Sequence, residues 1–220
     1  MEAFALIVSG VLLGLQHSFE ADHVAAVSTI VNKTKSIRQS SLIGAVWGLG
    51  HTATLLLIGM AMLVFKLAVP AWIGSRLELL VGVMLLVLGV GMLNRLRIGP
   101  HGHKNVGAIE VHSHDRKGLH MHLFKSFTIG MVHGLAGSGA LILLVLSTVG
   151  SIAEGLIFIA LFGIGSMAGM LAMGTMIGIP FKLSYGAKNA HGVLSLLAAI
   201  VSISLGIGIL YDGYGAGLLL

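Results

Sequence analysis

The sequence has no cysteine among its 220 residues, which excludes disulfide bonds and thiolate metal sites. Charged residues are also scarce: they make up 10% of the chain, whereas about a quarter of the residues in a soluble domain are charged. Hydrophobic residues account for 56% of the chain and glycine for 32 positions, and frequent glycine is typical of helices that pack closely in lipid. The composition therefore predicts an all-α integral membrane protein.

Motifs of several enzyme classes are missing as well. The glycine-rich stretch at 134–139 has no preceding strand and no following Lys-Ser/Thr pair, so it is not a phosphate-binding loop, and we expect no ATP hydrolysis by this chain. No His-Glu-x-x-His element occurs. The first apolar segment is too long, and too polar at its centre, to be a cleavable signal peptide. We expect neither enzymatic activity nor a nucleic-acid partner.

Six apolar stretches are long enough to cross the bilayer core of about 30 Å. They lie at 3–31, 42–65, 77–94, 126–149, 152–180 and 191–211. The first of them would measure about 43 Å as one straight helix, which is longer than the core. It also carries polar groups at its centre, so we expect this helix to be broken.

Lysine and arginine are divided unequally between the two sides of such a bundle. Eleven fall on one side and two on the other. The eleven are Lys33, Lys35, Arg38, Arg95, Arg97, Lys104, Arg116, Lys117, Lys125, Lys182 and Lys188; the two are Lys66 and Arg76. The positive-inside rule then predicts a plasma-membrane protein with both termini outside and a cytoplasmic loop at 95–125.

The two halves of the chain resemble each other. The segments GLQH, WGLG and LGVGML of the first half recur as GMVH, FGIG and LGIGIL, at offsets of 116, 115 and 117 residues. We therefore expect two three-helix repeats, 1–94 and 126–220, joined by the loop 95–125. Because three is an odd number of spans, the second repeat must cross the membrane in the opposite sense, as in many secondary transporters.

Ionisable side chains stand inside the predicted spans, where they are costly and usually mark a site or a pathway. Four of them fall within seven residues, in the stretch HSFEADH. The full set is His17, Glu20, Asp22, His23, His51 and His133. Imidazole with carboxylate suits a divalent transition metal, and we expect the four histidines and Asp22 to be the ligands. These residues do not choose among nickel, cobalt and zinc.

His17 followed by Asp22-His23 resembles the His-x4-Asp-His signature of the nickel/cobalt transporter (NiCoT) family, and Gly48–Thr52 (GLGHT) resembles its Gly-His-Ser/Thr element. Two later motifs of that family, built around Asp-Thr pairs, are absent, and HGLAGSGA at His133–Ala140 stands in their place. The chain is most similar to the shorter urease-accessory-type nickel permeases. The resemblance implies selective nickel or cobalt transport across the plasma membrane, with the first motif required.

Three further features have both a functional and a structural interpretation. The loop holds six histidines that could capture metal or merely keep a linker soluble: His101, His103, His112, His114, His120 and His122. A methionine row (Met167, Met170, Met173 and Met176) lines a path for a soft ion or, more commonly, packs flexibly. We interpret the glycines at 134–139 as a helix break that brings Ser138 opposite HSFEADH. Glu20, Thr52 and Ser138 are expected to support the ligands or handle protons.

The sequence thus predicts a secondary transporter that takes up Ni²⁺, with Co²⁺ as a second substrate, and needs no cofactor beyond the transported ion. Efflux of the same metals is the main alternative. A haem-binding electron carrier using His51 and His133 would leave the carboxylate-rich first motif without a role. A zinc hydrolase, with Glu20 as base and the histidines holding zinc, has no His-Glu-x-x-His element and no second acidic cluster to support it. Partners are the lipid bilayer and, by the resemblance, a nickel enzyme system such as urease.

Overall fold

The computed structural model describes residues 3–32, 34, 36–65, 71–98, 114–148 and 151–218. Within these residues the chain forms helices and no strand. The helices are α1 (Ala3–His17), α2 (Ala21–Val31), α3 (Ile37–Phe65), α4 (Ala71–Ile98), α5 (His114–Thr148), α6 (Ile152–Ser184) and α7 (Lys188–Leu218). The all-α class expected from composition is confirmed.

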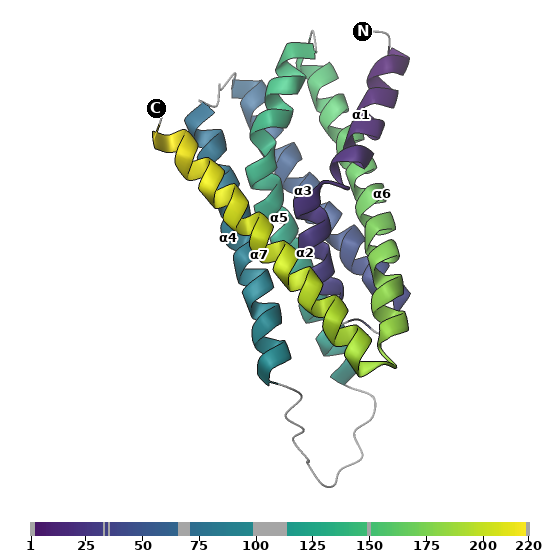
Figure 1. Cartoon of the computed structure of the whole chain (residues 1–220). Helices are drawn as coiled ribbons and strands as arrows, with labels where there is room; N and C mark the ends of the chain where they lie inside the picture. The colour runs from purple at the N-terminus through teal and green to yellow at the C-terminus, as the bar shows by residue number, and fades with distance from the viewer. Residues whose placement is uncertain are drawn as a thin grey trace.

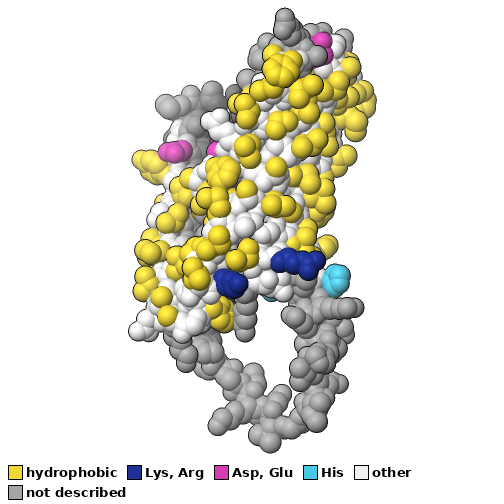
Figure 2. Space-filling model, turned by 90° about the vertical axis from the view of Figure 1, so that its right-hand side faces the viewer, with side chains coloured by type: hydrophobic (Ala, Val, Ile, Leu, Met, Phe, Trp, Pro, Cys, Tyr) yellow, Lys and Arg dark blue, Asp and Glu magenta, His cyan; other side chains and the backbone are white. Residues whose placement is uncertain are grey.

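The helices have the length and hydropathy of membrane spans. Among the described residues, four of them pass this test individually, within α3, α4, α6 and α7, and the bent pair α1–α2 counts as a fifth span. The remaining predicted span, 126–149, overlaps α5, which is not among the helices that pass this test over the described residues. Figure 2 shows hydrophobic side chains spread along the length of the molecule, with Lys and Arg gathered towards one end. The chain is a multi-pass membrane protein.

The predicted break in the first span is confirmed. α1 and α2 are bent by 57° relative to each other across Ser18–Glu20. At the end of α1 the backbone tightens: the N–H of Phe19 donates to the carbonyl of Gln16, and that of Glu20 to His17. Glu20 is then extended (φ −61°, ψ 150°) and begins α2 without a side-chain cap, so its carboxylate is free to bind elsewhere.

The second predicted break, at 134–139, is wrong. α5 continues without interruption from His114 to Thr148. Gly134 serves close packing instead, because a Cβ on it would lie 2.5 Å from the carbonyl oxygen of His51. Glycine lacks a side chain that would keep two helix backbones apart, and here it lets α5 approach α3 without disturbing the helix.

Glycine contacts in the two halves match each other. A Cβ on Gly14 would lie 1.9 Å from the carbonyl oxygen of Phe162, so α1 and α6 touch backbone to backbone. A Cβ on Gly130 would lie 2.2 Å from the carbonyl oxygen of Trp47, where α5 meets α3 in the same way. Gly130 and Phe162 follow Gly14 and Trp47 by 116 and 115 residues, so the two contacts are counterparts.

A second matched pair points the same way. A Cβ on Gly165 would lie 2.1 Å from the carbonyl oxygen of Val11. A Cβ on Gly50 would lie 2.2 Å from the carbonyl oxygen of Phe127. These are the contacts that two copies related by a two-fold axis would make. Both termini lie at the same end of the bundle (Figure 1), as an even number of spans requires. The packing therefore supports the inverted repeat, while the boundaries 1–94, 95–125 and 126–220 stay a prediction.

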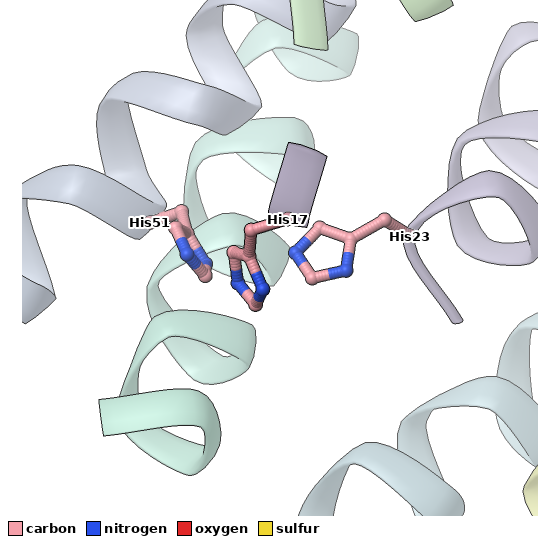
Figure 3. A group of neighbouring side chains, drawn as sticks. All are labelled: His17, His23 and His51. Carbon is pink, nitrogen blue, oxygen red and sulfur yellow. The ribbon is translucent and has the colours of Figure 1, made fainter. Parts of the chain in front are cut away.

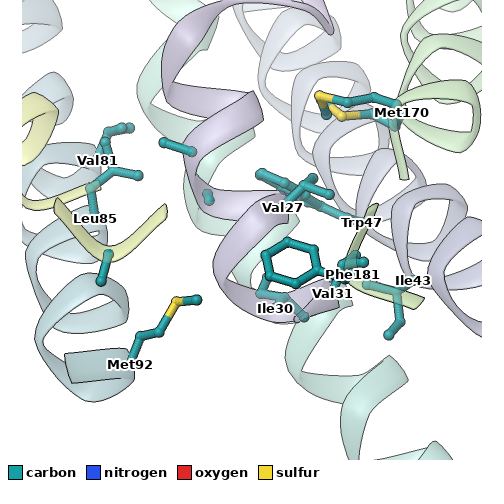
Figure 4. Close-up of a cluster of buried hydrophobic side chains, with 14 of the residues drawn as sticks. Val27, Ile30, Val31, Ile43, Trp47, Val81, Leu85, Met92, Met170 and Phe181 are labelled. Carbon is teal, nitrogen blue, oxygen red and sulfur yellow. The ribbon is translucent and has the colours of Figure 1, made fainter. Parts of the chain in front are cut away.

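α2 lies at the centre of the bundle. Its residues Val27 and Val31 are fully buried in a cluster (Figure 4) that also includes Trp47 of α3 and Leu85 of α4. Because apolar side chains from several helices surround α2, the polar residues at its first turn are held in a fixed place.

The methionine row of α6 takes part in packing. Met170 and Met173 are buried in the same cluster, whereas Met176 is exposed. Met170 also lies against Gly48 of α3: a Cβ added to Gly48 would be 3.2 Å from the Cβ of Met170. The burial agrees with the packing interpretation of the row.

The helices extend into the predicted loop. α4 continues to Ile98 and α5 begins at His114, inside the range 95–125. α5 has 35 residues, which corresponds to about 52 Å, so its polar first turns extend beyond a bilayer core of about 30 Å. Residues 99–113 lie outside the described residues.

Candidate metal-ion site

The break between α1 and α2 brings the first motif together. His17 is the last residue of α1 and His23 lies in the first turn of α2. A spacing of six residues would separate them on a straight helix, but after the bend their ring centroids are 4.6 Å apart. His23 is fully buried, and its ring stacks on that of Trp47 at 5.8 Å and 16°. The irregular backbone thus serves the site.

Each of these two histidines has a carboxylate on its Nδ1 atom. Glu20 Oε1 lies 2.9 Å from His17 Nδ1, and Asp22 Oδ1 lies 3.0 Å from His23 Nδ1. An ionised carboxylate only accepts hydrogen bonds, so each Nδ1 carries the proton and each Nε2 presents a lone pair. Carboxylate–histidine pairs of this kind orient imidazole ligands toward metals.

Two more histidines reach the same place from other helices. His51 of α3 lies with its ring centroid 5.3 Å from both His17 and His23. His133 of α5 lies 3.9 Å from His23, and its Nε2 atom is 3.0 Å from Asp22 Oδ2. Gly137, one turn after His133, would place a Cβ 4.0 Å from His17 Nε2. The structure therefore brings the five predicted ligands together.

The five residues form two overlapping groups. In each, three donor atoms lie within 4.8 Å of one another. One group consists of His17, His23 and His51, which face one another in Figure 3. The other consists of Asp22, His23 and His133. His23 belongs to both groups, so its ring is the common element of the site.

Several imidazole nitrogens of the site are buried without a hydrogen-bond partner among the described residues. They are Nε2 of His23, Nδ1 of His133 and both ring nitrogens of His51. A buried polar atom without a partner is destabilising by about 1–3 kcal/mol, so such a cluster is unusual unless something binds it. Nitrogen lone pairs next to a carboxylate suit a divalent transition metal rather than calcium or magnesium, which prefer oxygen.

A cavity of about 460 Å³ leads to the site. His17, Asp22 and His133 line it, together with Glu20 and Glu78. Asp22 is a quarter exposed and Glu20 about half exposed, whereas His23 and His51 are fully buried. The cavity thus connects the carboxylates of Glu20, Asp22 and Glu78 with the edge of the histidine cluster.

The supporting residues have different surroundings. Glu20 contacts His17, as described. The hydroxyl of Thr52 donates to the carbonyl of Gly163 at 3.2 Å, which ties α3 to α6 beside His51. Ser138 lies on the uninterrupted α5, and its side chain is outside the described set. The prediction that Ser138 lies at a helix break is therefore wrong.

The loop histidines are mostly outside the described residues. This applies to His101, His103 and His112, and to the side chain of His114. His120 is exposed and His122 partly exposed on α5. Metal capture by this segment stays a prediction.

Two residues near the site were missed. Glu78 of α4 lines the cavity, and the rule that an ionisable residue in a span marks a site would have found it within 77–94. Ser166 of α6 is buried, and its hydroxyl has no hydrogen-bond partner within the described part of the chain. It follows His51 by 115 residues, the repeat offset, so the repeat would have pointed to it.

Comparison with known proteins places the chain in a family. Residues 50–208 match the family described as the cytochrome C biogenesis protein transmembrane region. The match begins after His17–His23 and thus leaves out the first motif. No solved structure matches the chain.

Among curated proteins, the urease accessory protein UreH of Bacillus sp. (strain TB-90) is 37% identical over 96% of this chain and 93% of its own length. A protein of Methanocaldococcus jannaschii, whose name describes a nickel/cobalt efflux system, is 25% identical over 72% of this chain and 69% of its own length. The chloroplast protein FOR GROWTH AND FERTILITY 2 of Arabidopsis thaliana is 28% identical over 94% of this chain. The match covers 56% of the length of the Arabidopsis protein. The names of the Bacillus and Methanocaldococcus relatives describe an accessory protein and a transport system, not enzymes. The chain belongs to the nickel/cobalt permease family of the UreH type.

Proposed function

We propose that this nickel/cobalt transporter takes up Ni²⁺, and Co²⁺ as a second substrate, across the plasma membrane through the His/Asp cluster. The observation that carries the proposal is the meeting of four histidines and Asp22, from α1, α2, α3 and α5, with buried nitrogens that lack partners. His17, His23 and His51 would supply nitrogen ligands, and Asp22 would offset the ion's charge.

The membrane potential would suffice to drive uptake. Moving one charge across 100 mV corresponds to about 2.3 kcal/mol, so a divalent cation entering a negative interior gains about 4–5 kcal/mol. We therefore propose a uniporter or a carrier coupled to an ion gradient. The similarity to a urease accessory protein supports delivery of nickel to a nickel enzyme such as urease.

Efflux is the second candidate, and a specific observation favours it. One relative has a name that describes nickel/cobalt efflux. A haem carrier is less compatible with the geometry, because the ring of His23 lies 5.3 Å from His51 and 3.9 Å from His133. It would occupy space that a porphyrin between those two histidines needs.

Accumulation of radioactive nickel in cells tests the direction. Cells that express the protein are compared with cells that express His17→Ala at the same membrane level, and with His191→Ala as a histidine control at the α6–α7 end. Uptake predicts more nickel in wild-type and control cells than in the His17→Ala cells. Less nickel would indicate export through the same site, and equal nickel would contradict a nickel transporter that uses His17.

The proposed orientation places both termini outside and the loop 95–125 in the cytoplasm. Because the chain has no cysteine, a single introduced cysteine reports its own side of the membrane. We expect His112→Cys to react with an impermeant maleimide only in permeabilised cells, and a cysteine placed after Leu220 to react in intact cells. The reverse pattern would overturn the orientation without affecting the site.

A further inference from the structure

We propose that the transported ion occupies two overlapping sites in turn and passes between them around His23; this rests on the proposed function. The nitrogen site consists of His17, His23 and His51. The carboxylate site consists of Asp22, His23 and His133. Each is a set of three donor atoms within 4.8 Å of one another.

The two nitrogens of His23 face the two sites. Its Nδ1 atom lies 3.0 Å from Asp22 Oδ1, which in turn shares its carboxylate with His133. Its Nε2 atom is buried and has no hydrogen-bond partner in the described ranges, and in Figure 3 a nitrogen of His23 is directed at His17. One ring thus separates two sets of ligands.

The two sites cannot be filled at once. A neutral imidazole carries a proton on one nitrogen and a lone pair on the other, so His23 ligates through one nitrogen at a time. Two ions bound to opposite nitrogens, each at about 2.1 Å, would also stand about 6 Å apart and repel strongly in a medium of low dielectric constant. The sites are therefore alternatives for a single ion.

Asp22 has a different role in the two states. In the arrangement described here it accepts from His23 Nδ1 and from His133 Nε2, which leaves the nitrogen site ready to bind. When the ion moves to the carboxylate site, Asp22 and His133 become ligands, the ring proton of His23 shifts from Nδ1 to Nε2, and that of His133 shifts from Nε2 to Nδ1. The number of ring protons on each histidine is unchanged.

Each of the two sites contains one histidine that has a counterpart in the other repeat. His133 follows His17 by 116 residues, so these two histidines are counterparts, one in each site, on either side of His23. Both also line the cavity. An inverted repeat that exchanges the conformations of its halves would strengthen one site as it weakens the other, and it would move the ion without releasing it into lipid.

Cobalt binding to the purified full-length protein in detergent tests the proposal, with Co²⁺ alone as the probe. We expect one Co²⁺ per chain in the wild type. His133→Ala should bind one Co²⁺ whose X-ray absorption spectrum shows the ring scattering of three imidazoles, and His51→Ala one Co²⁺ whose spectrum shows that of two. The variant that combines His51→Ala with His133→Ala should bind Co²⁺ about 100-fold more weakly than the wild type, because it lacks a ligand in each site.

Reconstituted vesicles separate the two proposals. Both single variants should fail to move Ni²⁺ although they bind cobalt, whereas His191→Ala should bind and transport as the wild type does. Two Co²⁺ per wild-type chain, or equal loss of binding and the same spectrum in both single variants, would overturn the two-site inference. If the wild type moves no Ni²⁺ at all, the proposed function fails instead. Glutamine replaces alanine wherever gel filtration shows that a variant is misfolded.

Discussion

The two halves of the molecule share a packing scheme and differ in chemistry. Gly14 on Phe162 and Gly130 on Trp47 are matched backbone contacts, so both halves use glycine to bring helices together. Yet the first half has a broken helix and three of the four histidines of the site, whereas the second has a continuous α5 and contributes His133. Matched helix packing in the two halves therefore does not require matched chemistry at the site.

His51 of the first half and Ser166, its counterpart in the second half, allow the most direct test of this difference in chemistry. His51→Ala removes a fully buried imidazole of the nitrogen site, and we expect nickel accumulation to fall to the level of cells without the protein. Ser166→Ala removes an unpartnered hydroxyl, and we expect accumulation within about twofold of wild type because no hydrogen bond is lost. A strong loss in Ser166→Ala would mean that the second half also binds the ion at this level.

Asp22→Asn tests the carboxylate that joins the two halves. Asparagine has the same shape but cannot accept from His23 and His133 with both of its terminal atoms. Loss of such an orienting partner lowers metal affinity by about 10–100-fold. Isothermal titration with Ni²⁺ measures the change, and Asp212→Asn serves as control because Asp212 is an exposed carboxylate of α7 outside the site. Unchanged affinity in Asp22→Asn would contradict this role.

Gly14→Ala and Gly130→Ala test the two-fold packing. Each added Cβ would meet a backbone carbonyl oxygen, at 1.9 and 2.2 Å. Overpacking of this kind is destabilising by about 1–3 kcal/mol. We expect similar losses of thermal stability in detergent for both variants, and none for Gly208→Ala, whose Cβ meets nothing within 4 Å. A large effect at one position alone would argue against equivalent contacts.

Glu78→Gln has the smallest expected effect. Glu78 lines the cavity in the first half and would attract cations without ligating them. Removing its charge should raise the nickel concentration for half-maximal uptake about threefold at low salt, with little change in maximal rate, because surface charges act on encounter. High salt should reduce the difference. A lower maximal rate would instead place Glu78 among the groups that move with the ion.

Much of the site follows from residue type and spacing. HSFEADH cannot form one face of a straight helix, and its span is too long to be straight, so the break and the meeting of His17 with His23 were predictable. The glycines at 134–139 were misleading, because glycine serves both as a helix breaker and as a point of close contact. Only the neighbour decides between these roles, and the neighbour of Gly134 is the backbone of His51.

The sequence alone determined the membrane class and the broken first span, and it predicted the internal repeat and the candidate ligand residues. These follow from local properties: hydropathy, helix length and the cost of ionisable groups in lipid. The tertiary structure decided which atoms face one another. Asp22 lies between His23 and His133, the Nε2 atom of His23 has no partner, and Glu78 shares a cavity with Glu20. Such contacts depend on the rotation and approach of whole helices, which packing sets and no short stretch of sequence encodes.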